Sequence, residues 1–194
     1  MDKQKTIQKE ASIKGIGLHT GNTAKVTFKP APADTGINFV RTDLEGRPSV
    51  LASVDSVLSF SRSPRRTSIG RDTFEIQTIE HLMAAVGGLG IDNIYIEIDN
   101  NEVPGLDGSS ISYLELLKGC GIVEQEKERR HYSIKEPIFV EEDGASLIAV
   151  PSANFRISYT LSYNHPMLKS EFMEIEIDSD TFSKDIASDR KSVV

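Results

Sequence analysis

The sequence has 194 residues, of which 38% are hydrophobic and 26% are charged, so a packed core is expected and a disordered chain is not. Its formal net charge of −7 argues against nucleic acid as the main partner, because phosphate binding requires clustered lysine and arginine. No stretch is typical of a secretory signal or approaches the roughly 20 apolar residues of a membrane span. With a single cysteine, Cys120, no disulfide can form within the chain, and we expect a soluble, cytoplasmic protein.

The first third of the chain is expected to form strands. Residues 24–29 and 36–41 alternate apolar and polar side chains, which is typical of strands with one buried face. Residues 30–36 between them contain two prolines, an aspartate and a glycine, a composition typical of turns. The polar, basic segment 59–66 is expected to be an exposed loop, and residues 73–77 another short strand.

The apolar pattern then takes the spacing of helices. Residues 78–86 predict a helix that is capped by Thr78 and ended by the glycines at 87, 88 and 90. Residues 91–99 alternate again, as expected of a strand, and a second helix is expected over 109–118.

A dense run of charges at 124–130 predicts a solvated linker, with a domain boundary near residue 126. Residues 1–126 are expected to form an α+β domain in which two helices pack on a sheet. Residues 127–194 open a second α+β domain, with strands expected at 133–140, 145–150, 155–161 and 173–177, a hairpin turn at 141–144 and a helix beginning near 178–181. This second domain has no room for its helices, so we expect a bare apolar sheet face that promotes self-association.

Four segments in a fixed order carry a resemblance to a known family: GIGLHTG at 15–21, PAPADTGINFVRTD at 30–43, TIEHLMAAVGGLGIDNIYIEID at 78–99 and EVPGLDGSS at 102–110. Their order and spacing resemble the signature blocks of UDP-3-O-acyl-N-acetylglucosamine deacetylases. The segments IKEPIFVEEDG at 134–144 and SYNHP at 162–166 extend the resemblance into the second domain.

The resemblance implies two similar layered domains, each with a sheet packed against two helices, and an active site between them. It also implies a zinc-dependent hydrolase that removes the acetyl group from UDP-3-O-(3-hydroxyacyl)-N-acetylglucosamine, the committed step of lipid A biosynthesis. The zinc ion would be bound by two histidines and one aspartate.

Glu80 and His81 are the candidate catalytic pair. A histidine can bind a metal ion, and a neighbouring carboxylate can take a proton from a metal-bound water that attacks the acetamide. By spacing alone, a capping glutamate beside a surface histidine is the preferred interpretation of this pair. The resemblance implies that His81 is a zinc ligand and Glu80 the general base.

The other histidines are more ambiguous. His19 follows a tight Gly-x-Gly turn, and the resemblance implies a place near the active site and substrate, although a purely structural turn is an equal alternative. His165 precedes a proline, which favours an extended or turn backbone and a structural role. His131 lies at the edge of the charged run and has no assigned role.

Residues 107–109 precede the second predicted helix, whose free N–H groups could bind an anion. The alternative, which we prefer, is a turn followed by a helix cap at Ser109 or Ser110.

The sequence also departs from the family pattern. The resemblance implies a His-Lys-x-x-Asp pair that completes the zinc site and a further histidine for the oxyanion, and this chain contains neither. Lys191 and Ser192 stand where the family has a threonine and a phenylalanine that contact substrate. A zinc site needs three or four ligands. We therefore expect an N-terminal part of the enzyme, with a non-catalytic remnant or interaction module as the alternative.

Overall fold

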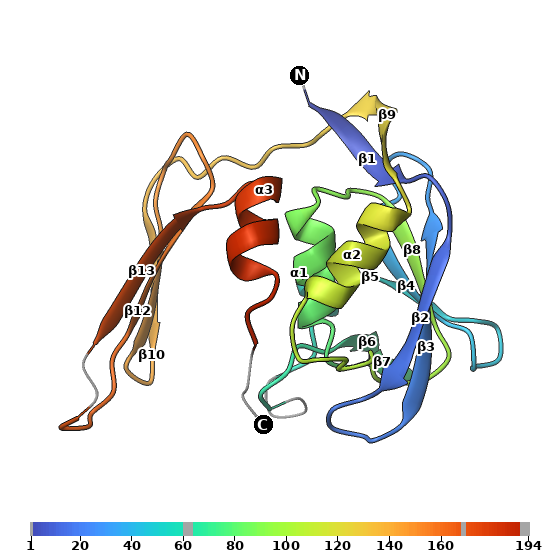
Figure 1. The fold of residues 1–194 in the computed structure, drawn as a ribbon, viewed down its shortest axis with the longest axis horizontal. Helices are drawn as coiled ribbons and strands as arrows, with labels where there is room; N and C mark the ends of the chain where they lie inside the picture. Colours follow the sequence, from blue (N-terminus) through green and yellow to red (C-terminus); the bar gives the residue numbers. More distant parts are fainter. Residues whose placement is uncertain (1, 60–63, 168–169, 191–194) are drawn as a thin grey trace. The chain divides into compact units, whose positions relative to one another are not determined.

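A computed structural model describes residues 2–59, 64–167 and 170–190, which divide into two compact units (Figure 1). One unit contains the described residues up to Arg129 together with those from Ser183 onward, and the other is Arg130–Phe182. The expected boundary near residue 126 falls inside a strand of the first unit, and the described residues after Ser183 return to that unit. Within the loop expected at 59–66, residues 60–63 lie outside the described chain.

The first unit mixes strands and helices, as the α+β prediction requires. Its elements are β1 (Lys3–Ile7), β2 (Ala11–Ile16), β3 (Thr23–Pro30), β4 (Ile37–Arg41), β5 (Ser49–Leu51), the 3-10 turn η1 (Val54–Ser56), β6 (Ile69–Arg71), β7 (Phe74–Ile76), α1 (Glu80–Gly88), β8 (Ile94–Ile98), α2 (Ile111–Gly119) and β9 (Ile122–Glu128).

A five-stranded sheet in the order β2-β3-β8-β4-β5 forms the base of this unit, with β4 parallel to β8 and the other pairs antiparallel. Alternate side chains of β8, at Ile94, Ile96 and Ile98, are fully buried, as are Val26 and Phe28 opposite them on β3. Helices α1 and α2 pack against each other on one side of the sheet (Figure 1). The alternation in the sequence therefore correctly predicts which face of the sheet is buried.

Tyr113 anchors α2 to the sheet. Its ring meets that of Phe28 edge to face, with the centroids 6.3 Å apart. The phenol is fully buried and donates a 2.5 Å hydrogen bond to the carbonyl of Pro104. Burial raises the pKa of Tyr113, so the hydroxyl stays protonated and remains a donor.

The charged run at 124–130 is a strand for most of its length, and the prediction of a linker is wrong. It forms most of β9, which pairs antiparallel with β1 and places Lys5 opposite Glu124. Two ion pairs add to the ladder, Lys127 with Asp34 and Arg129 with Asp92. Opposite charges across a strand pair favour the sheet, so charge density alone does not indicate a linker here.

Strand β1 was not predicted because its buried face is polar. Gln4 is buried, and its amide donates to Asp34 and to the carbonyl of Glu128 while its oxygen accepts from Asp34 and Asn93. Buried polar groups are tolerated when their hydrogen bonds are satisfied, and apolar alternation cannot reveal such a strand.

Helix α1 begins and ends later than its sequence pattern predicts. Its N-cap is Ile79, without a side-chain cap, and Thr78 lies outside the helix instead of capping it. Gly87 and Gly88 belong to the helix, and the chain leaves it at Gly90, whose φ of 65° lies in the left-handed region.

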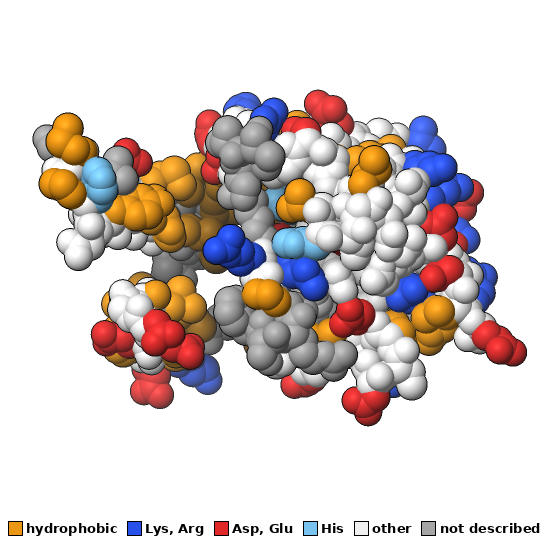
Figure 2. Space-filling view, turned by 90° about the horizontal axis from the view of Figure 1, so that it is seen from below, with side chains coloured by type: hydrophobic (Ala, Val, Ile, Leu, Met, Phe, Trp, Pro, Cys, Tyr) orange, Lys and Arg blue, Asp and Glu red, His pale blue; other side chains and the backbone are white. Residues whose placement is uncertain are grey.

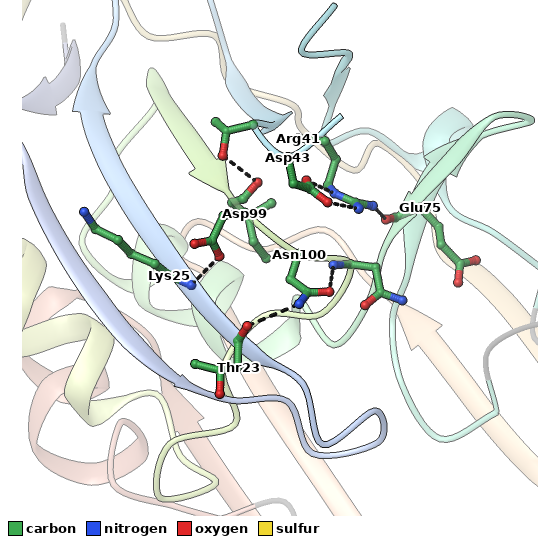
Figure 3. Close-up of polar contacts among 10 residues, drawn as sticks. Thr23, Lys25, Arg41, Asp43, Glu75, Asp99 and Asn100 are labelled. Atoms are coloured by element: carbon green, nitrogen blue, oxygen red, sulfur yellow. Dashed lines mark hydrogen bonds and ion pairs between the residues drawn. The ribbon is translucent and has the colours of Figure 1, made fainter. Parts of the chain in front are cut away.

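Arg41 connects the end of β4 to β7 (Figure 3). Its guanidinium forms two parallel hydrogen bonds to the carboxylate of Asp43, at 2.8 and 2.6 Å, and donates to the carbonyl of Glu75 at 2.9 Å. The hydrogen bonds from Arg41 hold the pKa of Asp43 below its ordinary value. This paired, buried guanidinium fixes the strand that leads into α1.

The second unit contains two hairpins and the start of a helix. Its elements are β10 (Ile138–Glu142), β11 (Ala145–Ala149), β12 (Arg156–Leu161), β13 (Glu171–Glu176), α3 (Ser179–Thr181) and the π-helical turn η2 (Phe182–Ile186), which runs on into the first unit. The predicted hairpin turn is confirmed, with positive φ at Asp143 and Gly144. The predicted helix start is also confirmed, because Asp178 forms a capping box with Thr181.

The two hairpins expose most of their apolar side chains (Figure 2). Leu147 and Phe172 are 74% and 67% exposed, and Phe139, Ile148 and Tyr159 are also largely exposed. Among the described residues the hairpins form two separate two-stranded sheets, β10-β11 and β12-β13, instead of one layered sheet. The expected bare apolar surface is therefore present.

None of the helices in the described residues is both long enough and apolar enough to cross a membrane.

Replacing Gly70 by alanine should destabilise the first unit. A Cβ at this position of β6 would lie 2.4 Å from the carbonyl oxygen of Phe74, which belongs to the paired strand and cannot move freely. We expect a loss of about 2–3 kcal/mol in the free energy of unfolding, measured by urea denaturation.

The matched control is Gly119→Ala at the end of α2, where a Cβ meets nothing within 4 Å. This change should stabilise the protein by about 0.5–1 kcal/mol, because alanine favours the helix over glycine. If the two variants unfold at the same urea concentration, the predicted clash at Gly70 is contradicted.

Candidate active site

The candidate site forms where two neighbouring segments leave the first unit's strands. The chain after β7 and the chain after β8 run parallel, with Gln77 and Glu102 as bridge partners. The N–H of Gln77 donates to Asn101 at 2.8 Å, and its carbonyl accepts from Val103 at 3.1 Å. These bonds bring the start of α1 beside Glu102.

Side chains at the end of β8 fix the approach to Glu102 (Figure 3). The N–H of Lys25 donates to the carboxylate of Asp99 at 2.6 Å. The amide of Asn100 donates to the carbonyl of Thr23 at 3.2 Å and accepts from the N–H of Asn101. The turn after β8 is thereby held against β3.

Glu102 is fully buried, and its carboxylate accepts hydrogen bonds from two separate segments. From the turn after β2, the N–H of His19 donates at 3.0 Å, and both the N–H and the hydroxyl of Thr20 donate at 2.7 Å. From the start of α1, the hydroxyl of Thr78 donates at 2.7 Å. The side chain of Glu102 therefore connects the turn at residues 17–21, the GLHTG turn, to the residues just before Glu80.

The carboxylate of Glu102 is ionised at neutral pH although it is buried. Burial alone would raise the pKa of Glu102, but the hydrogen bonds from Thr20, His19 and Thr78 outweigh burial and hold the pKa below its ordinary value. An ionised carboxylate only accepts hydrogen bonds, so it suits a site in which every neighbour is a donor.

Gly17 allows the turn to approach this carboxylate. A Cβ on Gly17 would lie 2.4 Å from Oε2 of Glu102. The turn is closed by hydrogen bonds from the N–H of Gly17 to Asn22 and from the N–H of Gly21 to Gly17, with Gly21 at a φ of 69°. The GLHTG sequence thus serves a close backbone approach as well as a tight turn.

Glu80 and His81 occupy the first turn of α1, at the helix start that the sequence predicts for them, and both are half-buried. Oε2 of Glu80 accepts a 3.0 Å hydrogen bond from the N–H of Thr67. The carbonyl of Thr67 in turn accepts from the N–H of Ile79 at 3.2 Å. The segment that leads into β6 therefore holds both the helix start and the carboxylate of the candidate base.

The other three histidines lie outside helix α1. The imidazole of His19 is exposed, and only its backbone N–H bonds to Glu102. His131 and His165 belong to the second unit. Residues 2–59, 64–167 and 170–190 contain no group of three histidine, cysteine, aspartate or glutamate side chains arranged to hold a metal ion. His81 alone does not make a zinc site, and Lys191 and Ser192 lie outside the described residues.

The segment 107–109 forms a turn and not an open anion site. The carboxylate of Asp107 accepts from the N–H and the hydroxyl of Ser109, and Ser109 accepts from the N–H of Ile111. The N–H of Ser110 donates to the carbonyl of Ala187. These N–H groups are already bonded to the protein, which supports the preferred interpretation of a turn. Ser110 is the N-cap residue of α2, but it makes no side-chain cap hydrogen bond, and its hydroxyl donates to the carbonyl of Ala187 instead.

The sequence analysis did not predict the hydrogen bonds that Thr20 and Thr78 donate to Glu102. Each of these residues lies inside a segment that was noticed for other reasons, and the Glu102–Thr20 contact joins residues 82 positions apart. The available signal was an acidic residue shortly after an apolar strand and directly before Val103 and Pro104. Such a residue tends to be buried only when it is paired or hydrogen-bonded.

Stability should fall more steeply in acid for the wild-type chain than for Glu102→Gln. The pKa of Glu102 is lowered in the folded state, so the unfolded chain takes up the proton first as the pH falls. The stabilisation is present above the unfolded pKa and is lost as the pH falls through the folded pKa.

We expect Glu102→Gln to lose about 3 kcal/mol near pH 7, because the glutamine amide faces donors. In urea unfolding curves, the difference in the free energy of unfolding between the two proteins should narrow as the pH falls below the unfolded pKa and through the lowered folded pKa of Glu102. The other carboxyl groups titrate alike in both proteins, so parallel pH curves would contradict the assignment.

Comparison with known proteins identifies the chain's relatives. The family model for UDP-3-O-acyl N-acetylglycosamine deacetylase matches residues 4–192. The chain is 40% identical over 187 residues to the UDP-3-O-acyl-N-acetylglucosamine deacetylase of Bdellovibrio bacteriovorus, which covers 96% of this chain and 61% of that protein. It is 40% identical over 188 residues to the enzyme of the same name from Oleidesulfovibrio alaskensis, and 38% identical over 187 residues to that of Geobacter sp., covering 96% of this chain and 60% of each relative. The chain thus spans about three fifths of the length of these curated relatives. On the match over nearly its whole length, this chain belongs to the UDP-3-O-acyl-N-acetylglucosamine deacetylase family.

Proposed function

We propose that this chain is part of a hydrolase that removes the N-acetyl group from UDP-3-O-(3-hydroxyacyl)-N-acetylglucosamine, releasing acetate and a free amine. The names of its relatives support the deacetylation of a UDP-3-O-acyl-N-acetylglucosamine, and the 3-hydroxyacyl chain is part of the proposal. The observation that carries the proposal to this chain is the Glu80–His81 pair in the first turn of α1, at a junction held by the buried Glu102. The step would belong to lipid A biosynthesis.

Glu80 would act as the general base. Its carboxylate is half-buried, and the N–H of Thr67 donates a 3.0 Å hydrogen bond that helps to orient it. A carboxylate in this position can take the proton from the water that attacks the acetamide carbonyl, and then pass it to the departing amine. The exposed GLHTG turn with His19 would lie on the substrate side of the same junction.

Zinc is the cofactor we propose for the family reaction, with His81 as one ligand. The described residues do not supply the other ligands, so we derive no catalytic step through the metal. The UDP-sugar is the proposed partner, and a cytoplasmic location would suit that substrate.

A second candidate function is a non-catalytic interaction module. It is favoured by the exposed apolar side chains of β10–β13, which would promote self-association. Sedimentation and the binding of an apolar dye to the purified chain test this second function. A monomer that binds no such dye would count against the interaction module.

Glu80→Gln should lower turnover by at least about 100-fold, because a general base contributes 10²–10⁴-fold. The amide oxygen can still accept from Thr67, so the variant should fold. The measurement is the rate of acetate release from the UDP-sugar. The protein assayed is the gene product at its full length in the source cells, which is established first by measuring its intact mass.

The control is Glu115→Gln, a change of the same chemistry at an exposed position of α2. It should leave turnover unchanged. Full turnover by Glu80→Gln would remove Glu80 from the role of base.

A further inference from the structure

Thr78 has an unusual backbone conformation at the entrance to α1. Its φ is 59°, in the left-handed region, which branched side chains rarely adopt. The residue is buried and follows directly on the bridge between Gln77 and Glu102. Such conformations persist only where the surrounding structure enforces them, and they gather at functional sites.

Two sets of bonds hold Thr78 in this conformation. The neighbouring residue Gln77 is fixed on both sides by the backbone of Asn101 and Val103. The hydroxyl of Thr78 is fixed by a 2.7 Å hydrogen bond to Oε1 of Glu102. The next residues are the N-cap Ile79 and then Glu80, so the direction in which α1 leaves this point depends on Thr78.

The other side of the same carboxylate holds the turn that carries His19. Three donors from His19 and Thr20 converge on Glu102, and Gly17 is close enough that no larger residue fits. A movement of Glu102 would therefore affect the turn and the start of α1 together.

We propose that Glu102 is a positioning residue, whose carboxylate sets where the Glu80–His81 pair lies relative to the GLHTG turn. The expected effect of Glu102 on catalysis rests on the proposed function, whereas its effect on the positions of the two segments does not. Glu102 does not touch the reacting atoms in this proposal. It acts through Thr78 on one side and through His19 and Thr20 on the other.

The chemistry of the donors explains why a carboxylate is needed. Four donor groups, two N–H and two O–H, point at two oxygens, which together offer about four lone pairs. A glutamine would turn an NH₂ group toward donors on one side. The bonds to either Thr78 or the turn would then be lost, and the two segments would no longer share one anchor.

The test compares Thr78→Val with Thr78→Ser in the catalytically active gene product. Valine keeps the shape of threonine but removes the hydroxyl, whereas serine keeps the donor to Glu102. We expect Thr78→Val and Glu102→Gln to lower kcat by about 10- to 100-fold with KM changed less than about threefold, since small misplacements of catalytic groups have effects of this size. Thr78→Ser should recover most of the kcat that Thr78→Val loses.

Ile7→Val controls for stability, because it removes one methyl group from a fully buried side chain of β1, which pairs with β9 and contains neither Glu102 nor Thr78. All proteins are assayed below their unfolding transitions. The proposal is overturned if Thr78→Val loses no more kcat than Ile7→Val, or if Thr78→Ser loses as much as Thr78→Val. If Glu102→Gln does not fold, the comparison of Thr78→Val with Thr78→Ser still tests the proposal.

A second readout does not depend on activity. In the isotope-labelled chain, the ring resonances of His81 and the amide resonance of His19 should both shift in Thr78→Val. They should keep their wild-type positions in Ile7→Val and nearly so in Thr78→Ser. If the complete gene product shows these shifts but has no deacetylase activity, the positioning role is supported and the proposed function is refuted. Unchanged resonances in Thr78→Val would refute the positioning role, whatever the activity.

Discussion

The buried carboxylate of Glu102 is the interaction on which the candidate site depends. A carboxylate without exposure to water is stable only if donors surround it, and here the donors come from the turn after β2 and from the start of α1. The two segments are far apart in the sequence and neither contacts the other in a regular sheet. Their common anchor makes the GLHTG turn and the Glu80–His81 pair parts of one local structure.

The fold of the first unit holds in place the two segments that meet at Glu102. The five-stranded sheet and the helices α1 and α2 bury an apolar core, while charged and polar side chains fix the strand ends. Arg41 holds β7 against β4, and Asp99 holds the turn after β8 against β3. Glu102 and Thr78 thus lie at the ends of two restrained strands, which keeps a small polar cluster in place.

The second unit has a different physical character. Its hairpins keep regular registers and a well-formed turn at Asp143–Gly144, yet Phe182 is the one buried residue among its described positions. Its apolar side chains remain in contact with water, which is costly and favours association. The first unit therefore carries the candidate catalytic residues on a packed core, whereas the hairpins of the second unit carry exposed apolar side chains.

The sequence by itself determined the α+β class, the family, most strands and helices, and the placement of Glu80 and His81 in the first turn of a helix. These follow from local periodicity and from ordered sequence blocks, which need no knowledge of distant contacts. Only the tertiary structure decided that residues 124–128 pair with β1, that Gln4 lies in a buried strand, and that Thr78 serves Glu102 and not the helix cap. In each of these cases a polar or charged side chain is stabilised by a partner from a remote part of the chain, and local pattern carries no record of that partner.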